Sequence, residues 1–85
     1  ASHEKHIPVV TREGDTVKVT VGSVAHPMAD EHHIAWVYLQ TCRGGQRKCL
    51  KVGSDPVVTF ALCDEEPVAV YAYCNLHGLW KADVE

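Results

Sequence analysis

Runs of alternating or β-branched apolar residues constrain the fold of this chain more than any other feature. The run VKVTV at 17–21 has the period of two that puts every second side chain on one face of a sheet. Valine, isoleucine, tyrosine and tryptophan, which fill such runs, favour strands. No stretch is typical of a helix. The other strands predicted in this way are HIAWVYLQTC at 33–42, VVTF at 57–60 and VAVYAY at 68–73.

Turn-forming residues separate these runs at intervals of about ten residues, which is typical of an antiparallel sandwich or barrel. The segment RGGQRK at 43–48 is typical of the tip of a hairpin that returns through CLKV. With a short last strand near KADVE, we expect about seven strands in an all-β, immunoglobulin-like antiparallel β-sandwich. The clearest turns are REGD at 12–15, GSDP at 53–56 and DEEP at 64–67.

Length and charge narrow the class of protein further. A chain of 85 residues supports one small core, so we expect a single domain over residues 1–85. Its net charge of −3 provides no basic surface for nucleic acid. The longest apolar run, VAVYAYC at 68–74, is too short to span a bilayer. The opening ASHEKHIP lacks the apolar segment of a signal peptide, which predicts a cytoplasmic protein or one whose leader has been removed.

Nearly all the side chains that could bind a metal fall in three segments, each in a loop or at the end of a predicted strand. Loops at one end of a sandwich cluster in space, so residues far apart in sequence can converge on one site. The segments are HEKHIP at 3–8, HPMADEHHIAW at 26–36 and CNLHG at 74–78.

Cys74 and His77 are the first candidate ligands. A thiolate and an imidazole three positions apart can bind one ion from a single tight turn, and Gly78 gives that turn conformational freedom. A buried free cysteine beside an incidental histidine is the alternative for this pair.

The sequence favours some of the remaining histidines as metal ligands more than others. Pro27 restricts the backbone next to His26 and so fixes the direction of its imidazole. By strand alternation His32 shares the bulkier, inward face with Ile34 and Trp36, whereas His33 is expected to be exposed or to support a ligand. His6 would complete a set of four histidines and one cysteine. His3 is left unassigned.

The segments EKHIP, HPMADEHHIAW and CNLHGLWK resemble the iron-site motifs of the superoxide reductase family, which comprises the neelaredoxins and the catalytic domain of the desulfoferrodoxins. The resemblance runs from residue 4 to residue 82 and implies an immunoglobulin-like β-sandwich. It also implies one mononuclear iron centre that cycles between Fe2+ and Fe3+ and keeps its sixth position open. The ligands that it implies are four equatorial histidines and an axial thiolate: His6, His26, His32, His77 and Cys74.

The resemblance further implies a one-electron reduction of superoxide to hydrogen peroxide. Glu4 and Lys5 match the family's acidic and basic pair beside the open position: the lysine attracts the anion and assists protonation, and the glutamate can occupy that position in the oxidised state. Trp80 matches an aromatic residue near the centre. The chain begins almost on the EKHIP motif, so we expect either a one-iron form without the N-terminal rubredoxin-like four-cysteine domain of two-iron members or a catalytic domain separated from a larger parent. The implied electron donor is an external protein such as rubredoxin. Association into a homo-oligomer is left open.

Two other classes of function are weighed against this one. A non-catalytic iron- or zinc-binding or electron-transfer module would have a closed coordination shell, and a plain immunoglobulin-like interaction domain would bind no metal. The cysteines outside the motif have their own expectations. Cys42 and Cys49 flank the predicted hairpin tip and form either a disulfide or two free thiols. Cys63 is expected to be a small core residue.

Overall fold

The computed structural model describes residues 2–84 of the chain and contains seven strands and one short helix. Ala1 and Glu85, the two ends of the predicted domain, lie outside the described residues. In chain order the elements are α1 (Ser2–His6), β1 (Pro8–Glu13), β2 (Thr16–Val21), β3 (Ile34–Thr41), β4 (Gly44–Cys49), β5 (Val57–Ala61), β6 (Pro67–Cys74) and β7 (Gly78–Asp83).

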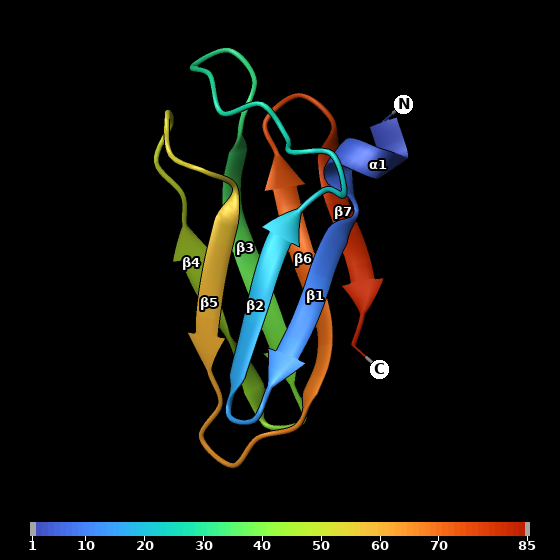
Figure 1. Cartoon of the computed structure of the whole chain (residues 1–85), viewed down its shortest axis with the longest axis vertical. Coiled ribbons are helices and arrows are strands. Elements are labelled where there is room, and N and C mark those ends of the chain that lie inside the picture. Colours follow the sequence, from blue (N-terminus) through green and yellow to red (C-terminus); the bar gives the residue numbers. More distant parts are fainter. Residues whose placement is uncertain (1, 85) are drawn as a thin grey trace.

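The strands form two antiparallel sheets that pack face to face (Figure 1). One sheet has the order β1-β2-β5 and the other the order β4-β3-β6-β7. Every pairing within them is antiparallel. The prediction of an all-β antiparallel sandwich of about seven strands is therefore confirmed.

The core lies between the two sheets and is built from alternate residues of the central strands. Burying one side chain in two is what the period-two runs of the sequence require, because successive side chains point to opposite faces. The buried apolar residues include Val17, Val19 and Val21 of β2, Phe60 of β5, Val37 and Leu39 of β3, and Val70 and Ala72 of β6.

The hairpin between β3 and β4 is tighter than the sequence predicts. Thr41 pairs with Gly44, so the connection is only the two residues Cys42 and Arg43, and most of the segment predicted to be the tip belongs to β4. Gly44 has a positive φ of 142°, which lets the chain reverse at this point. The glycines that suggested a long tip instead allow an early return.

The structure decides between the alternatives for Cys42 and Cys49 and corrects the expectation for Cys63. Cys49 pairs with Trp36 on β3, whereas Cys42 lies in the turn, so the two thiols do not face each other across the hairpin. All four cysteines are free, and the disulfide alternative is wrong. Cys63 is exposed rather than part of the core, because the chain leaves β5 at Ala61 before reaching it.

The helix α1 contradicts the expectation of a chain without helices. It is a single turn of five residues, in which the amide of Ile7 donates a hydrogen bond to the carbonyl of His3 at 3.0 Å. So short a segment cannot display the 3.6-residue period by which helices are recognised. No helix within residues 2–84 is long and apolar enough to cross a membrane.

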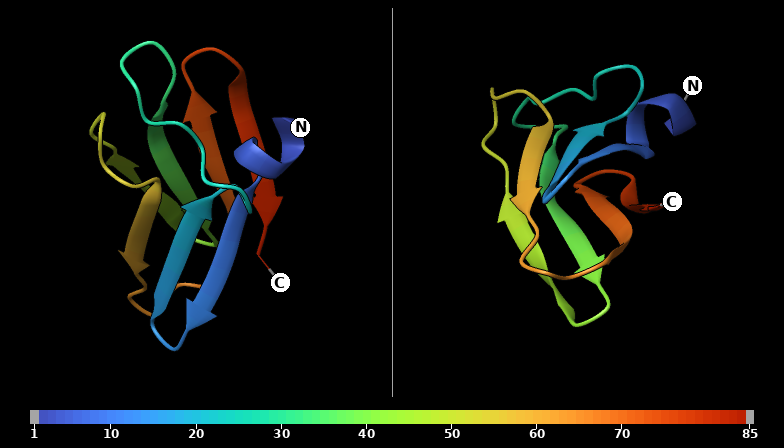
Figure 2. Two further views of the ribbon diagram at one scale, coloured as in Figure 1. Left: turned by 45° about the horizontal axis from the view of Figure 1, so that its top comes forward. Right: turned by 60° about the horizontal axis from the view of Figure 1, so that its bottom comes forward.

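The metal-capable segments meet at one end of the sandwich. Figures 1 and 2 show α1, the connection from β2 to β3 and the turn from β6 to β7 at the same end. Backbone and side-chain bonds join the first two: the carbonyl of Glu4 accepts hydrogen bonds from the amide of Val24 at 3.0 Å and from Ser23 Oγ at 3.3 Å.

Gly22 permits this close approach between α1 and the end of β2. It has a φ of 87°, and a Cβ at this position would lie 2.6 Å from the carbonyl oxygen of Lys5 and would also contact that of Val24. Both neighbours are backbone atoms, so neither can move aside without shifting its segment. The absence of a side chain at residue 22 thus allows α1 to lie this close to the end of β2.

We expect Gly22→Ala to displace α1 and to destabilise the protein more than Gly53→Ala does. Gly53 has a similar φ of 90°, but a Cβ at residue 53 would have no neighbour within 4 Å, so this variant isolates the strain of the left-handed backbone. Gly22→Ala should lower the free energy of unfolding, measured with urea, by about 1 to 3 kcal/mol more than Gly53→Ala does, because only Gly22→Ala adds a steric clash. Equal destabilisation by the two substitutions would contradict this account.

Candidate metal centre

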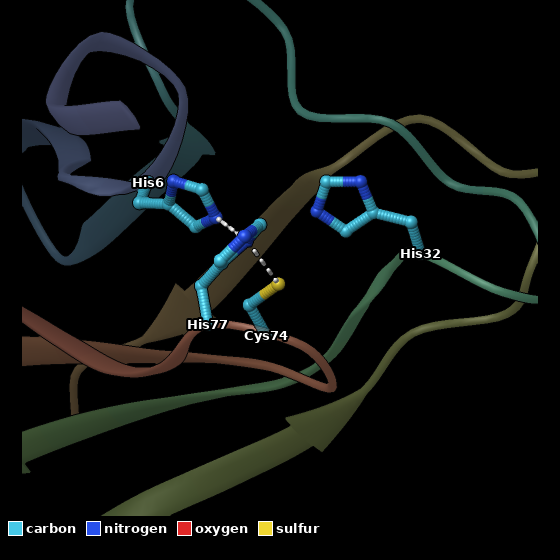
Figure 3. A group of neighbouring side chains, drawn as sticks. All are labelled: His6, His32, Cys74 and His77. Carbon is cyan, nitrogen blue, oxygen red and sulfur yellow. Dashed lines mark hydrogen bonds between the residues drawn. The ribbon is translucent and has the colours of Figure 1, made fainter. Parts of the chain in front are cut away.

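Four side chains from three separate segments converge at the end of the sandwich. They are His6 at the end of α1, His32 just before β3, Cys74 at the end of β6 and His77 in the turn to β7. Each offers one ligand atom, and these atoms all lie within 4.8 Å of one another. Figure 3 shows the three imidazoles and the thiol facing a common centre.

The spacing of the donor atoms suits a shared ion. His77 Nδ1 lies 3.1 Å from His6 Nε2 and 3.7 Å from Cys74 Sγ. Two nitrogens bound at about 2.1 Å to one metal and at right angles to each other would be about 3.0 Å apart. The group therefore has the chemistry and the dimensions to hold a metal ion.

His26, the fifth predicted ligand, lies next to this group but is not one of the four. Its Nε2 is 3.0 Å from His6 Nε2, and its side chain is buried. Its Nδ1 lies 2.7 Å from the carbonyl oxygen of Pro27, and because a carbonyl only accepts, Nδ1 must donate. Nε2 is then left with a lone pair directed at the cluster, as in a metal-binding histidine held by a second hydrogen bond.

The environment of the cluster favours the neutral, metal-binding form of the imidazoles. Burial lowers the pKa of His26 and of His32 below the usual histidine value, and the neighbouring imidazoles lower both further. Within residues 2–84, His32 Nε2 is a buried nitrogen without a hydrogen-bond partner. Such an atom is costly unless something binds it, and a metal ion would do so.

Glu4 and Lys5, the predicted catalytic pair, lie on the exposed side of α1 beside His6. The positive charge of Lys5 contributes to the lowered pKa of His32, so this charge acts on the cluster. Glu4 fixes α1 through its backbone carbonyl, as described above.

Two aromatic contacts extend from the cluster. The ring of Trp80 stacks on that of His6, with centroids 4.7 Å apart and planes inclined by 22°. His3, unassigned from the sequence, contacts the edge of Trp80 at a centroid distance of 5.5 Å. His33 lies outside the group of four, and its Nδ1 lies 3.1 Å from the carbonyl oxygen of Ala29.

His32 does not reach the cluster by the strand alternation that favoured it over His33. The alternation is interrupted by a register shift between Ile34 and Trp36, so Ile34 is buried whereas Trp36 is only partly so. The two therefore do not share the inward face, and that expectation is wrong. His32 enters the cluster from the connection before β3, where it forms a backbone bridge with Ala29.

Asn75 is a residue of this region that sequence reasoning missed. It lies between Cys74 and His77 and bonds to the segment that carries His32. The signal that could have found it was a side-chain amide placed between two candidate ligands.

Comparison with known proteins gives a consistent result. A family model described as Desulfoferrodoxin matches residues 1–83. A desulfoferrodoxin homolog of Archaeoglobus fulgidus is 47% identical over 79 residues, which are 93% of this chain and 62% of that protein. A superoxide reductase of Pyrococcus horikoshii is 38% identical over an alignment of 100 positions, gaps included, which covers 96% of this chain and 87% of that protein. The chain thus spans less than two thirds of the Archaeoglobus relative.

Solved structures show the same likeness. The superoxide reductase from Treponema pallidum matches with a TM-score of 0.93 and 56% identity, over 98% of this chain and 69% of that one. The one-iron superoxide reductase from Giardia intestinalis matches with a TM-score of 0.81 and 32% identity, over 96% and 98% of the two chains. On its sequence and on its fold, the chain belongs to the desulfoferrodoxin family.

Proposed function

We propose that this chain is a superoxide reductase that works at one mononuclear iron. The observation that carries the proposal is the gathering of three imidazoles and a thiol within 4.8 Å at the end of the sandwich. Relatives named superoxide reductase, which this chain matches over most of their length, support it.

The proposed ligands are the four clustered residues and His26. Four imidazoles and one thiolate exceed the four-coordinate shell that is usual for structural zinc, and imidazole with a soft thiolate suits iron. Bound ferrous iron would supply the single electron that reduces superoxide, and the ferric ion would then need an electron from outside. The five proposed residues are His6, His26, His32, Cys74 and His77.

We propose that the positive charge of Lys5 attracts the substrate. Superoxide is an anion, whereas the whole chain carries a net charge of −3, so attraction must come from local positive charge. The ammonium of Lys5 acts on His32 and provides that charge beside the cluster. One superoxide, one electron and two protons give one hydrogen peroxide, and Lys5, directly or through a water, is the proposed proton donor.

Glu4 is the proposed acidic partner of Lys5 on α1. Its carboxylate is on the exposed side of the helix, one residue from Lys5 and two from His6. We propose that, with iron bound, this carboxylate would serve as a further ligand of the oxidised ion. A carboxylate in this role would limit unwanted ligands between turnovers.

In this proposal the electron comes from a separate protein. Among the described residues Cys42, Cys49 and Cys63 are exposed free thiols, and Cys74 lies within the proposed centre. A rubredoxin-like donor, a cytoplasmic location and a single domain over residues 1–85 belong to the same proposal.

The test is to mix the iron-loaded, reduced protein with superoxide. We expect one hydrogen peroxide for each iron oxidised and no dioxygen, because the reaction is a reduction and not a dismutation. Tight iron binding without oxidation by superoxide would favour a non-catalytic module instead. Failure to bind iron in a stoichiometric ratio would remove the proposal.

Cys74→Ser should abolish the visible charge-transfer band of the ferric protein, because the band requires a thiolate ligand. Loss of the soft ligand should also weaken iron binding, measured as iron retained after gel filtration. Cys63→Ser is the control, since Cys63 is an exposed thiol outside the cluster and its replacement should leave the band unchanged. A normal band in Cys74→Ser would exclude Cys74 as a ligand.

Lys5→Ala should slow the reaction with superoxide by about tenfold at low ionic strength, and by less as salt is added, since salt screens steering by an exposed charge. Stopped-flow measurement of iron oxidation over a salt series gives both values. Lys18→Ala removes the same charge from an exposed position on β2 and should change the rate little. An unchanged rate in Lys5→Ala at low salt would exclude Lys5 from the reaction.

A further inference from the structure

We propose that Asn75 is a positioning residue that holds the His32-bearing segment against the turn carrying Cys74 and His77. This inference rests on the metal centre proposed above and assigns the centre a residue that binds no metal itself.

The geometry consists of three hydrogen bonds between Asn75 and the residues on either side of His32. The Oδ1 of Asn75 accepts from the amide of His33 at 2.9 Å, and its Nδ2 donates to the carbonyl of Glu31 at 3.2 Å. The amide of Asn75 donates to the carbonyl of His33 at 3.2 Å. Asn75 therefore forms hydrogen bonds to the backbone on both sides of His32.

The segment around His32 has other attachments as well. The amide of Gly53 donates to the carbonyl of Met28, four residues before His32, at 2.7 Å. Before β3 begins at Ile34, the backbone of His32 pairs with that of Ala29 through two hydrogen bonds, at 2.9 and 3.1 Å. The pairing of β3 with β6 is itself irregular just beyond, between Ile34 and Trp36. The bonds between Asn75 and His33 continue the pairing of β3 with β6 by one residue beyond Ile34 and Cys74. They hold the backbone next to His32 close to Cys74.

Asparagine suits this task through its chemistry. Its planar amide presents one acceptor and two donor hydrogens side by side, so it can bond to an amide and a carbonyl at once. Aspartate retains the acceptor but lacks the donor, and alanine lacks both. Because Asn75 is exposed, water competes for these bonds, so they should affect the position of His32 more than the stability of the whole fold.

The test compares Asn75→Ala with Gln46→Ala. Gln46 also uses a side-chain amide to bond a backbone carbonyl, that of Ala61 at 2.8 Å, but it joins β4 to β5 away from the cluster. Two measurements are made: amide hydrogen exchange in the metal-free protein, and release of Fe2+ from the loaded, reduced protein to an excess of a ferrous chelator. Circular dichroism verifies that each variant is folded.

In Asn75→Ala we expect the His33 amide to exchange about tenfold faster and Fe2+ to be released at least about tenfold faster than in the wild type, as is typical when a residue supporting a ligand is lost. Gln46→Ala should match the wild type in both. Wild-type exchange at His33 and wild-type iron release in Asn75→Ala would overturn the proposal. So would equally fast release from Gln46→Ala, which would indicate general loosening.

Asn75→Asp provides a second variant if the alanine variant does not fold. It should keep the His33 amide protected, because the carboxylate still accepts, and should release Fe2+ faster than the wild type, because the bond to Glu31 is lost. Wild-type release from Asn75→Asp would overturn the role of that bond. Failure of the wild type to bind iron would count against the proposed function alone. The exchange rate of the His33 amide, which is measured without metal, would then still decide this inference.

Discussion

The register between β3 and β6 is the constraint on which the centre depends. Ile34 pairs with Cys74, and Val70, Ala72 and Cys74 alternate into the core with the pleat of β6. A slip of one residue would turn the thiol to the outer face and bring Tyr73 inward, because side chains alternate along a strand. The apolar partners of the same face hold the register, so the packing of the core also aims the sulfur. The site is thus an extension of the hydrophobic core rather than an addition to its surface.

The core ends in a cluster that is unfavourable without an ion. His6, His26 and Cys74 are buried, and among the described residues His32 Nε2 is a buried nitrogen without a hydrogen-bond partner. Buried polar atoms of this kind cost stability, and proteins retain them chiefly at functional sites. The surrounding sandwich, with its fully buried valines and Phe60, is what keeps these rings together.

Sequence patterns predicted most of the strands and the gathering of metal-capable side chains at one end of the sandwich, because both follow from local rules. Period two identifies strands such as β2, and histidines beside prolines or glycines mark loops at strand ends. Other features depended on tertiary context. The helix α1 is a single turn held by Gly22 and the 22–24 connection, and the irregular pairing after Ile34 arises between strands distant in sequence. Cys63 was expected in the core because it follows an apolar run, whereas β5 ends at Ala61 and leaves Cys63 exposed. The roles of Glu4, Lys5 and His26 remain predictions.

The contribution of α1 has a consequence for the durability of the site. All seven strands of the described residues lie after residue 7, so neither sheet includes the segment that carries His6. Undocking of this one helical turn would therefore withdraw His6 from the group of four without breaking a single pairing between strands.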